Sequence, residues 1–384
     1  MKVQMVIKTT GLQYDDRLRK EALSLLRSGS DARIVVLENA NIPRQTVAYS
    51  AVPAESIALT TRHMFPRGRA LVFKTIEMNV RFLARIIRER PDVVWVHDFA
   101  PAGLIPVLAM IRKLGVLRRV VWDQHELPSE RFLTWTAARI LLTAVMNLCD
   151  YVVVANSWRR EFLLASLGGR CRASIAVLEN FPDDIFVQLP EGELPQSVSK
   201  WLNGKPFVFS QGGAGPGRNF HRLVAAIMMV PNLKLVVAGP HNEKEVKRLQ
   251  AQYGKSLEEK VYFAGFVPQL QMTPFIDDAV ASVVFYERTN SNNLLCASNK
   301  LYQAVARGVP VLVGLNPPMK ELVDQYQCGI VVDDDDPSEI AAALVELLSK
   351  REELAGNARR VGHRFLWHQQ DSTIRAVAEG NPGA

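Results

Sequence analysis

The sequence predicts an α/β protein made of two doubly wound, parallel-sheet domains in tandem. Its 384 residues are enough for two to three domains of average size. Short β-branched runs alternate with amphipathic helical stretches along nearly the whole chain, which is typical of a parallel sheet covered by helices on both faces. One proline-rich segment, residues 181–206, interrupts this alternation and marks the boundary between the domains.

In the first half, the strand candidates are short and mostly apolar, as expected for strands buried on both faces. They lie at residues 3–7, 33–37, 93–97, 119–122, 151–155 and 174–178. The stretches between them carry apolar residues at helical spacing. These helix candidates lie at residues 16–27, 70–90, 102–113, 130–148 and 157–167.

The second half repeats the alternation. Its strand candidates lie at residues 207–210, 233–238, 261–264, 281–285, 309–313 and 329–332, and its helix candidates at residues 219–229, 243–253, 299–307, 318–326 and 337–348. We therefore expect a first domain at residues 1–185, a linker at 186–205 and a second domain at 206–358. Doubly wound sheets bind ligands at the carboxyl ends of their strands, so a site is expected in a cleft between the two domains.

The composition excludes several classes of protein. Hydrophobic residues make up 48% and charged residues 22%, which excludes a disordered chain, a coiled coil and a disulfide scaffold. The four cysteines are far apart and form no C-x-x-C pair, so we expect reduced thiols in a cytoplasmic protein, with neither a zinc site nor a redox motif. The N-terminus does not resemble a secretory signal. The longest nearly apolar run, residues 101–111, is too short to span a bilayer, so no integral membrane protein is expected.

The net charge of +7 is unevenly distributed. Residues 1–190 hold 26 Lys and Arg against 18 Asp and Glu, whereas residues 191–384 hold 20 against 21. A basic half indicates an anionic partner, which could be nucleic acid, an acidic membrane surface or a phosphorylated substrate. Arg81, Arg85 and Arg88 share one helix face, which could equally be a solvated face. Because no aromatic residues interleave with the arginines, we expect no nucleic acid partner.

A glycine-rich loop at residues 209–220 is the first site candidate. Gly212, Gly213 and Gly217 follow a strand, and Arg218 precedes a helix. Glycines allow backbone N–H groups to approach an anion, a helix N-terminus adds a favourable dipole, and an arginine can bind phosphate oxygens through two hydrogen bonds. The loop is neither a Walker loop nor a G-x-G-x-x-G motif. A purely structural turn would explain the same glycines.

The second candidate is the helix that begins near residue 299. Ser298 or Asn299 can cap it, and Lys300 falls in its first turn, where the helix dipole favours a diphosphate. Gln303 lies one turn further on the same face and could reach ribose hydroxyls. The alternative is that Lys300 and Gln303 are ordinary exposed helix residues.

The chain resembles family 4 glycosyltransferases of the two-domain GT-B architecture, closely in its second half and more loosely in its first. The motifs of the second half are, in order, the glycine loop with Arg218, LKLVVAGP (233–240), VYFAGFVP (261–268), SNKLYQAVARGVPVL (298–312), ELV (321–323) and CGIVVDDDDPSEIAAAL (328–344). Those of the first half are YDDRLRKEALSLLRSG (14–29), VHDF (96–99), WDQHELPSE (122–130) and DYVVVANS (150–157). The resemblance implies two Rossmann-like domains facing across a cleft, with residues 359–384 crossing back onto the first domain.

The resemblance also implies a donor site in the second domain. Relatives carry an E-x7-E element at the nucleotide sugar; Leu295 stands at its first position and Gln303 at its second, on the ribose. Arg218 matches the phosphate-binding arginine, and Lys300 would supply the positive charge of a lysine that is absent here. Glu321 matches an acidic residue in a loop facing the donor.

In the first domain, His125 stands where the family places a histidine facing the transferred sugar. Asp98 and Gly11 follow two other strands that would line the same cleft, and Glu126 is next to His125. A structural role for a single histidine is the alternative. The resemblance thus implies His125, Arg218 and Lys300 as the catalytic set.

The implied activity is a retaining, hexosyl-type glycosyltransferase that uses a nucleotide sugar, UDP-linked by preference, with no metal and no other cofactor. Residues 333–336 resemble a metal-binding D-x-D, but they precede Pro337, so we interpret them as a helix cap at the surface. Leu295 and Gln303 in place of acidic residues leave a non-catalytic binding or scaffold subunit as an alternative. A sugar-nucleotide epimerase, which shares the two-domain shape, is the other alternative.

The basic first domain is expected to receive a glycan or lipid-linked acceptor in surface polysaccharide or glycoconjugate biosynthesis. Phe132, Leu133 and Trp135 beside Arg131 fit contact with an anionic membrane. We therefore expect a cytoplasmic protein, with peripheral attachment to the inner face of the cytoplasmic membrane as a further hypothesis.

Overall fold

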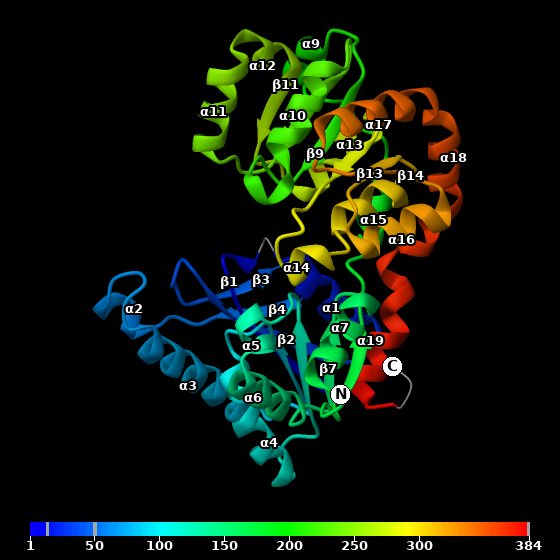
Figure 1. Cartoon of the computed structure of the whole chain (residues 1–384). Coiled ribbons are helices and arrows are strands. Elements are labelled where there is room, and N and C mark those ends of the chain that lie inside the picture. The colour runs from blue at the N-terminus through cyan, green and yellow to red at the C-terminus, as the bar shows by residue number, and fades with distance from the viewer. Residues whose placement is uncertain (13–14, 49–51, 382–384) are drawn as a thin grey trace. The chain divides into compact units, whose positions relative to one another are not determined.

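The computed structural model describes residues 1–12, 15–48 and 52–381. The chain divides into two compact units: Met1–Glu179 with Gln370–Ala384 form the first, and Asn180–Gln369 form the second. Each unit is built on one sheet, as Figure 1 shows.

The first unit has an eight-stranded sheet in the order β3-β4-β2-β1-β5-β6-β7-β8. All neighbouring strands are parallel except β3 and β4, which form an antiparallel pair at one edge. Its strands are β1 (Lys2–Thr9), β2 (Asp31–Glu38), β3 (Arg44–Ala48), β4 (Val52–Ser56), β5 (Val93–His97), β6 (Arg119–Gln124), β7 (Tyr151–Val154) and β8 (Ser174–Val177). The strand order changes direction between β1 and β5, which makes this pair the switch point of the sheet.

Helices connect these strands, and the C-terminal helix joins them. The helices of the first unit are α1 (Asp16–Arg27), α2 (Thr60–Met64), α3 (Leu71–Glu89), α4 (Ile105–Lys113), α5 (Glu130–Thr134), α6 (Thr136–Met146), α7 (Ser157–Leu167) and α19 (Asp371–Glu379). Figure 1 shows α19 in red within this unit, where Asp371 accepts hydrogen bonds from Ser24 and Arg27 of α1.

The second unit has a six-stranded, wholly parallel sheet in the order β11-β10-β9-β12-β13-β14. Its strands are β9 (Phe207–Gln211), β10 (Lys234–Ala238), β11 (Val261–Gly265), β12 (Ser282–Val284), β13 (Val311–Val313) and β14 (Gly329–Val331). Here the switch point lies between β9 and β12. Its helices are α8 (Asp184–Gln188), α9 (Gln196–Leu202), α10 (Phe220–Met229), α11 (Glu243–Tyr253), α12 (Lys255–Lys260), α13 (Thr273–Asp277), α14 (Ser291–Leu294), α15 (Asn299–Ala306), α16 (Pro317–Tyr326), α17 (Pro337–Ser349) and α18 (Arg351–Val361).

The central strands are apolar on both faces, which explains why they lack a simple alternation of polar and apolar residues. In β9, Phe207 and Phe209 pack into one core cluster and Val208 packs into another. In β10, Val236 joins the first of these clusters and Val237 the second. The sheet is therefore a rigid platform from which the loops at its carboxyl edge project.

The expected doubly wound organisation is confirmed, but its boundaries differ from those expected. The segment assigned to a linker contributes Val198 and Leu202 to the core of the second unit, together with Phe186. Residues 359–369 also belong to this unit, because Phe365 packs into the same core and the backbone N–H of Trp367 donates to Pro182. Among the described residues, only those after Gln369 return to the first unit.

Two local details also differ. The expected helix at residues 130–148 is interrupted at Trp135, whose extended backbone separates α5 from α6. The hairpin of β3 and β4 was not expected, because its short strands carry little apolar patterning. Among the described residues, no helix is both long and apolar enough to cross a membrane.

Candidate functional site

Arg218 and Tyr286 meet at the switch point of the second sheet. Arg218 ends a short 3-10 turn, η3 (Pro216–Arg218), that follows β9, and Tyr286 follows the neighbouring strand β12. The guanidinium carbon of Arg218 lies 3.7 Å from the centre of the Tyr286 ring. The backbone N–H of Glu287 donates to the carbonyl of Gly217 at 3.2 Å, which joins the two loops. The cation is therefore held at the edge where such sheets bind ligands.

Lys300 reaches the same tyrosine from the first turn of α15. Its Nζ donates to the Tyr286 hydroxyl at 3.2 Å and lies 5.5 Å from the ring centre. Ser298 caps α15 by accepting from the Lys300 backbone N–H at 3.3 Å, and its Oγ lies 3.1 Å from the Tyr286 hydroxyl. Tyr286 thus holds one cation against its face and another at its hydroxyl, an arrangement suited to an anion with several charged oxygens.

Gly212 makes room for the Lys300 side chain. Its φ of +105° favours glycine, and a Cβ atom there would lie 2.7 Å from Lys300 Cε and 3.0 Å from Nζ. The backbone N–H groups of Gly212 and Gly213 both donate to the carbonyl of Ala238, at 2.8 and 3.0 Å. The expectation that these two amides are free to bind an anion is therefore wrong. The side chains of Arg218 and Lys300 are therefore stronger candidates for binding an anion than these two amides.

The remaining predicted donor residues lie close in sequence to this pair. Ser298, rather than Asn299, is the N-cap of α15, and Asn299 is the half-buried first residue of that helix. Gln303 is only 1% exposed, and its Oε1 has no hydrogen-bond partner among the described residues. Leu295 is also buried. Gln303 is thus not an ordinary exposed helix residue.

Glu321 is placed differently from the expectation. It lies in α16 and is exposed, not in a loop. Pro317 and Pro318 start this helix early because the fixed φ of proline suits the first helical turn, where a missing N–H is not needed.

The acidic run at residues 333–336 has two roles. Asp336 caps α17 by accepting from the backbone N–H two residues on, at 2.8 Å, as expected. Residues 333–335 all pair with Arg288, which lies in the loop that carries Tyr286. Asp334 is fully buried and accepts from Asn219 Nδ2 at 2.6 Å. The interpretation as a surface cap is thus incomplete, because these carboxylates also brace the loops on either side of the switch point.

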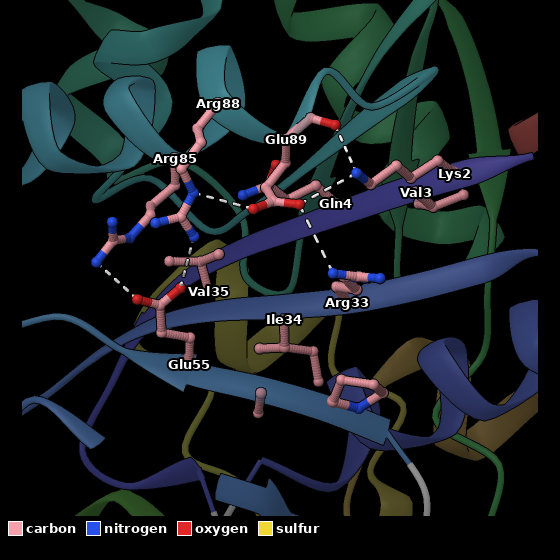
Figure 2. Close-up of a pocket in the computed structure, with 12 residues that line it drawn as sticks. Lys2, Val3, Gln4, Arg33, Ile34, Val35, Glu55, Arg85, Arg88 and Glu89 are labelled. Carbon is pink, nitrogen blue, oxygen red and sulfur yellow. Dashed lines mark hydrogen bonds and ion pairs between the residues drawn. The ribbon is translucent and has the colours of Figure 1, made fainter. Parts of the chain in front are cut away.

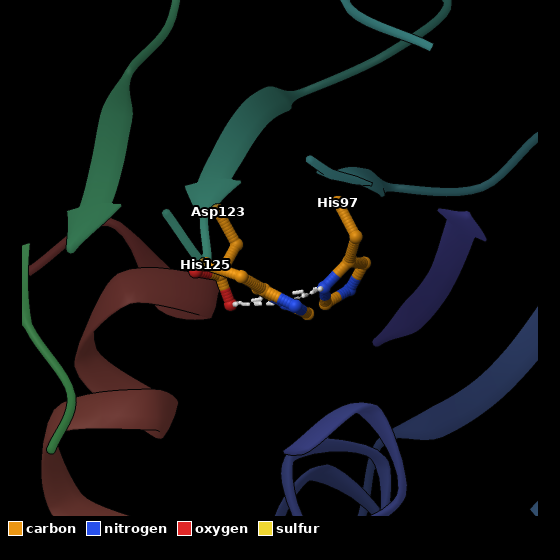
Figure 3. A group of neighbouring side chains, drawn as sticks. All are labelled: His97, Asp123 and His125. Atoms are coloured by element: carbon orange, nitrogen blue, oxygen red, sulfur yellow. Dashed lines mark hydrogen bonds and ion pairs between the residues drawn. The ribbon is translucent and has the colours of Figure 1, made fainter. Parts of the chain in front are cut away.

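In the first unit, His125 lies among other ionisable groups at the ends of β5 and β6 (Figure 3). Its Nε2 lies 3.2 Å from His97 Nδ1 and 3.6 Å from an oxygen of Asp123. Its Nδ1 lies 3.7 Å from Asp98 Oδ2. Asp98 adopts a left-handed backbone, with φ of +63°, directly after β5. Such strain in a non-glycine residue persists only where neighbours hold it.

These neighbours decide the charge on each ring. Burial opposes a charge on His125, but the carboxylates of Asp98 and Asp123 outweigh burial and raise its pKa to about 10. Burial lowers the pKa of His97 to about 3. At neutral pH His125 is therefore an imidazolium whose Nε2–H donates to the neutral Nδ1 of His97. The Nε2–H of His97 then has no hydrogen-bond partner among the described residues.

A buried arginine completes the cluster. Arg17 donates to both oxygens of Asp123, each at 3.1 Å, and to the carbonyl of Leu178 at 2.8 Å. Burial and the charge of Asp123 raise the pKa of Glu21 well above its usual value. Burial opposes the charge of Asp123, but Arg17 and His125 hold the pKa of that carboxyl well below its usual value. The cluster therefore favours the ionised form of Asp123 and disfavours the ionised form of Glu21, whose Oε1 lies 2.9 Å from Arg17 Nε.

His97, Asp123 and His125 each offer an atom that could bind a metal, and these atoms lie within 4.8 Å of one another. However, Arg17 already binds both oxygens of Asp123, and His125 carries a proton that a metal would have to displace. The donor set thus fits a charged hydrogen-bond network better than a metal ion. Metal independence stays a prediction.

The other predicted residues of the first unit follow adjacent strands. Gly11 is buried and follows β1, which lies beside β5, and β5 lies beside β6. Gly11, Asp98 and His125 therefore share one carboxyl edge. Glu126 is exposed beside His125. Tyr14, the first residue of one family motif, lies outside the described residues.

Sequence reasoning missed Tyr286, His97, Arg17 and Glu21. Tyr286 and His97 each stand at a strand end, and that position was the available signal. Arg17 and Glu21 look like the solvated face of an amphipathic helix, yet Arg17 is 8% exposed and Glu21 is fully buried.

Comparisons with known proteins agree with this architecture. Residues 196–361 match the family described as glycosyl transferases group 1. The chain is 26% identical over 284 residues to a GDP-mannose-dependent α-(1-6)-phosphatidylinositol monomannoside mannosyltransferase of Mycolicibacterium smegmatis. The aligned region covers 70% of each chain.

Solved structures share the fold. Sucrose-phosphate synthase from Thermosynechococcus elongatus superimposes with a TM-score of 0.73 at 14% identity, over 99% of this chain and 98% of that one. Anabaena HepE, solved in complex with UDP, gives a TM-score of 0.72 at 16% identity, over 99% and 100%. Residues 196–361 thus match a group 1 glycosyltransferase domain, and the whole chain has the GT-B fold of these solved structures, in agreement with the resemblance.

Proposed function

We propose that this chain is a GT-B glycosyltransferase that moves a hexose from a nucleoside diphosphate sugar to a glycan or lipid-linked acceptor, with retention of anomeric configuration and without a metal. The observation that carries this proposal is the convergence of Arg218 and Lys300 on Tyr286 at the switch point of the second sheet. Two fixed positive groups at that edge suit a diphosphate.

The positive groups would act where charge develops. As the bond between the anomeric carbon and the β-phosphate oxygen breaks, negative charge grows on the leaving diphosphate. Arg218 and Lys300 would stabilise that charge, a role that a divalent metal plays in other transferases. Because Tyr286 already orients both side chains, little reorganisation would be needed during the reaction.

Retention would follow from attack on the face that the diphosphate leaves. The acceptor oxygen would bond to the anomeric carbon while its proton passes to the departing phosphate oxygen. No dedicated base is then required. This agrees with the state of His125, because an imidazolium with a pKa of about 10 cannot accept a proton at neutral pH. Because its Nε2–H is bound to His97, His125 would instead donate one hydrogen bond, from Nδ1–H, that orients the sugar or the incoming hydroxyl.

The donor base is a separate question. The family resemblance favours UDP, and HepE was solved with UDP, whereas the mycobacterial relative is named for GDP-mannose. The diphosphate is common to both donors, and Arg218 and Lys300 would recognise that shared part.

The test is a hydrolysis and transfer screen over UDP-, GDP-, ADP- and TDP-sugars with the full chain. We expect release of one nucleoside diphosphate, which Arg218→Ala and Lys300→Ala each reduce at least tenfold. Arg222→Ala, which removes a cation bound to Asp335 outside this pair, is the matched control. Absence of both hydrolysis and nucleotide binding with every donor would favour the non-catalytic alternative that Leu295 and Gln303 suggest.

A further inference from the structure

The outward face of α3 is apolar. Val72, Phe73, Ile76 and Val80 are 70, 63, 55 and 58% exposed. Val72, Ile76 and Val80 are spaced four residues apart, and Phe73 lies three residues before Ile76, so all four lie along one side of the helix. The opposite side packs inward through Met78, Phe82 and Ile86, which are at most 3% exposed. An ordinary surface helix presents polar residues to water, so a contiguous apolar face marks an interaction surface.

Positive charge accompanies this face. Residues 60–90 contain eight Lys and Arg but only two Asp and Glu. Toward the C-terminal end of α3 the cations are paired, because Arg85 and Arg88 bind Glu55, as Figure 2 shows. The cations that line the cavity of about 390 Å³ in that view are each paired with Glu55 or Glu89, and we assign it no ligand.

The opposite end of α3 is different. A cavity of about 540 Å³ lies there, lined by the cations Lys8, Arg62, Arg67 and Lys74, by uncharged polar residues and by the apolar Leu71 and Phe65. None of the described residues that line it carries a carboxylate. Lys8 belongs to the carboxyl-terminal part of β1, so the cavity opens near the edge of the sheet that carries Gly11, Asp98 and His125.

The four cations of this cavity have two roles. Lys74 Nζ donates to the carbonyls of Phe65 and Pro66, at 3.0 and 2.8 Å, and Arg62 donates to the carbonyl of Glu38. These two side chains hold the segment between β2 and α3. Lys8 and Arg67 are exposed, and neither has an ion-pair partner among the described residues. Two unpaired cations beside an apolar helix face are suited to a phosphate at a lipid surface.

We propose that the first unit docks on an anionic bilayer through the α3 surface, defined as Leu71, Val72, Phe73, Ile76 and Val80, while Lys8 and Arg67 bind the phosphate of a lipid headgroup. A second copy of the chain is a poorer occupant, because pairing two α3 surfaces would bring two cationic segments together. The proposal does not depend on the donor site, which lies in the other unit.

The surface differs from the one that the sequence suggested. Leu133, expected at the membrane, is only 6% exposed, although Phe132 and Trp135 are exposed. α3 offers more apolar side chains on one face, and the free cations lie at its end.

The test is flotation of the full chain with vesicles of phosphatidylcholine alone or with 30% phosphatidylglycerol, a composition chosen as the probe. We expect at least tenfold stronger binding to the anionic vesicles. The double variants Phe73→Ser with Ile76→Ser, and Lys8→Ala with Arg67→Ala, should each lower that binding at least tenfold. Val345→Ser, an equally exposed apolar position on α17, and Arg88→Ala, a paired cation on α3, are the matched controls and should bind as the parent does.

A second measurement separates docking from misfolding and from loss of the donor site. In Phe73→Trp, the tryptophan emission should shift to shorter wavelength with anionic vesicles, and hydrolysis of the nucleotide sugar in solution should be unchanged in all four variants. Equal, low binding of the parent to both kinds of vesicle would overturn the proposal. So would a dimer, seen by light scattering, that the Phe73→Ser and Ile76→Ser substitutions abolish. If the parent chain does not hydrolyse any nucleotide sugar, that result would count against the proposed function and not against membrane docking.

Discussion

Arg218 lies over the ring of Tyr286, with its guanidinium carbon 3.7 Å from the ring centre. The two residues are 68 positions apart in sequence and meet because β9 and β12 are neighbours at the switch point of the second sheet. Lys300 reaches the same residue through its hydroxyl. Tyr286 therefore determines how the two cations of the proposed diphosphate site are spaced.

Substitution of Tyr286 should separate its two contributions. Tyr286→Phe keeps the ring under Arg218 but removes the hydroxyl that contacts Lys300 and Ser298. Nucleoside diphosphate binding should weaken about three- to tenfold, which is the effect expected for the loss of one hydrogen bond. Tyr286→Ala also removes the cation–π contact, and the loss should reach roughly 100-fold. Isothermal titration calorimetry measures both. Tyr326→Phe, in the same unit, is the control, and equal affinity in all three variants would contradict this role.

Gly212→Ala should displace Lys300. The new methyl group would lie 2.7 Å from Lys300 Cε, and the residue has a φ of +105° that suits glycine. We expect tenfold or greater loss of diphosphate affinity and a decrease of about 1–3 kcal/mol in the free energy of unfolding. Gly215→Ala is the matched control in the same loop, because a Cβ atom there meets nothing within 4 Å and its φ is not positive. Unchanged calorimetric affinity in Gly212→Ala would show that Lys300 does not need this space.

Removal of Arg17 should destabilise the first unit. Arg17→Ala leaves the fully buried Asp123 without its partner of two hydrogen bonds, a change that typically lowers the free energy of unfolding by about 3–5 kcal/mol. Arg27→Ala on the same helix removes an exposed ion pair with Asp371 and should lower it by less than about 1 kcal/mol. Urea denaturation distinguishes them. If both substitutions lower the free energy of unfolding by a similarly small amount, Asp123 does not depend on Arg17 for its stability.

The stability should depend on pH through His125. Its pKa is raised from 6.5 to about 10 in the folded chain, so the folded state holds a proton that the unfolded state releases above pH 6.5. The stabilisation is therefore complete below pH 6.5 and is lost as the pH rises through 10. It should be on the order of a few kcal/mol, since one pKa unit corresponds to about 1.4 kcal/mol.

His125→Gln removes this titration. The difference in unfolding free energy between the parent and this variant, measured from pH 6 to pH 10, should shrink as the pH rises. A constant difference across that range would show that His125 is not held as an imidazolium.

The alternation of strands and helices could be predicted because doubly wound sheets impose it on the sequence. The β3–β4 hairpin and the break at Trp135 could not, since both depend on packing rather than on local periodicity. The prolines of residues 186–205 predict a linker, yet Val198 and Leu202 pack into the core of the second unit.

The residues of the candidate site could also be predicted only in part. Arg218 and Lys300 could be predicted because each stands beside a helix start that follows a strand or a capping residue. Tyr286 could not be assigned, because its role depends on which strands are neighbours, and strand order is invisible in one sequence. The raised pKa of His125 also depends on Asp98 and Asp123, which meet it only in the folded sheet.

The most direct test of the central claim compares nucleoside diphosphate with the unphosphorylated nucleoside, for the base that the donor screen selects, by calorimetry with the parent chain, Arg218→Ala and Lys300→Ala. If the two cations bind the diphosphate, each variant should lose at least tenfold in affinity for the diphosphate and almost none for the nucleoside. Equal losses for both ligands, or none for the diphosphate, would contradict the account.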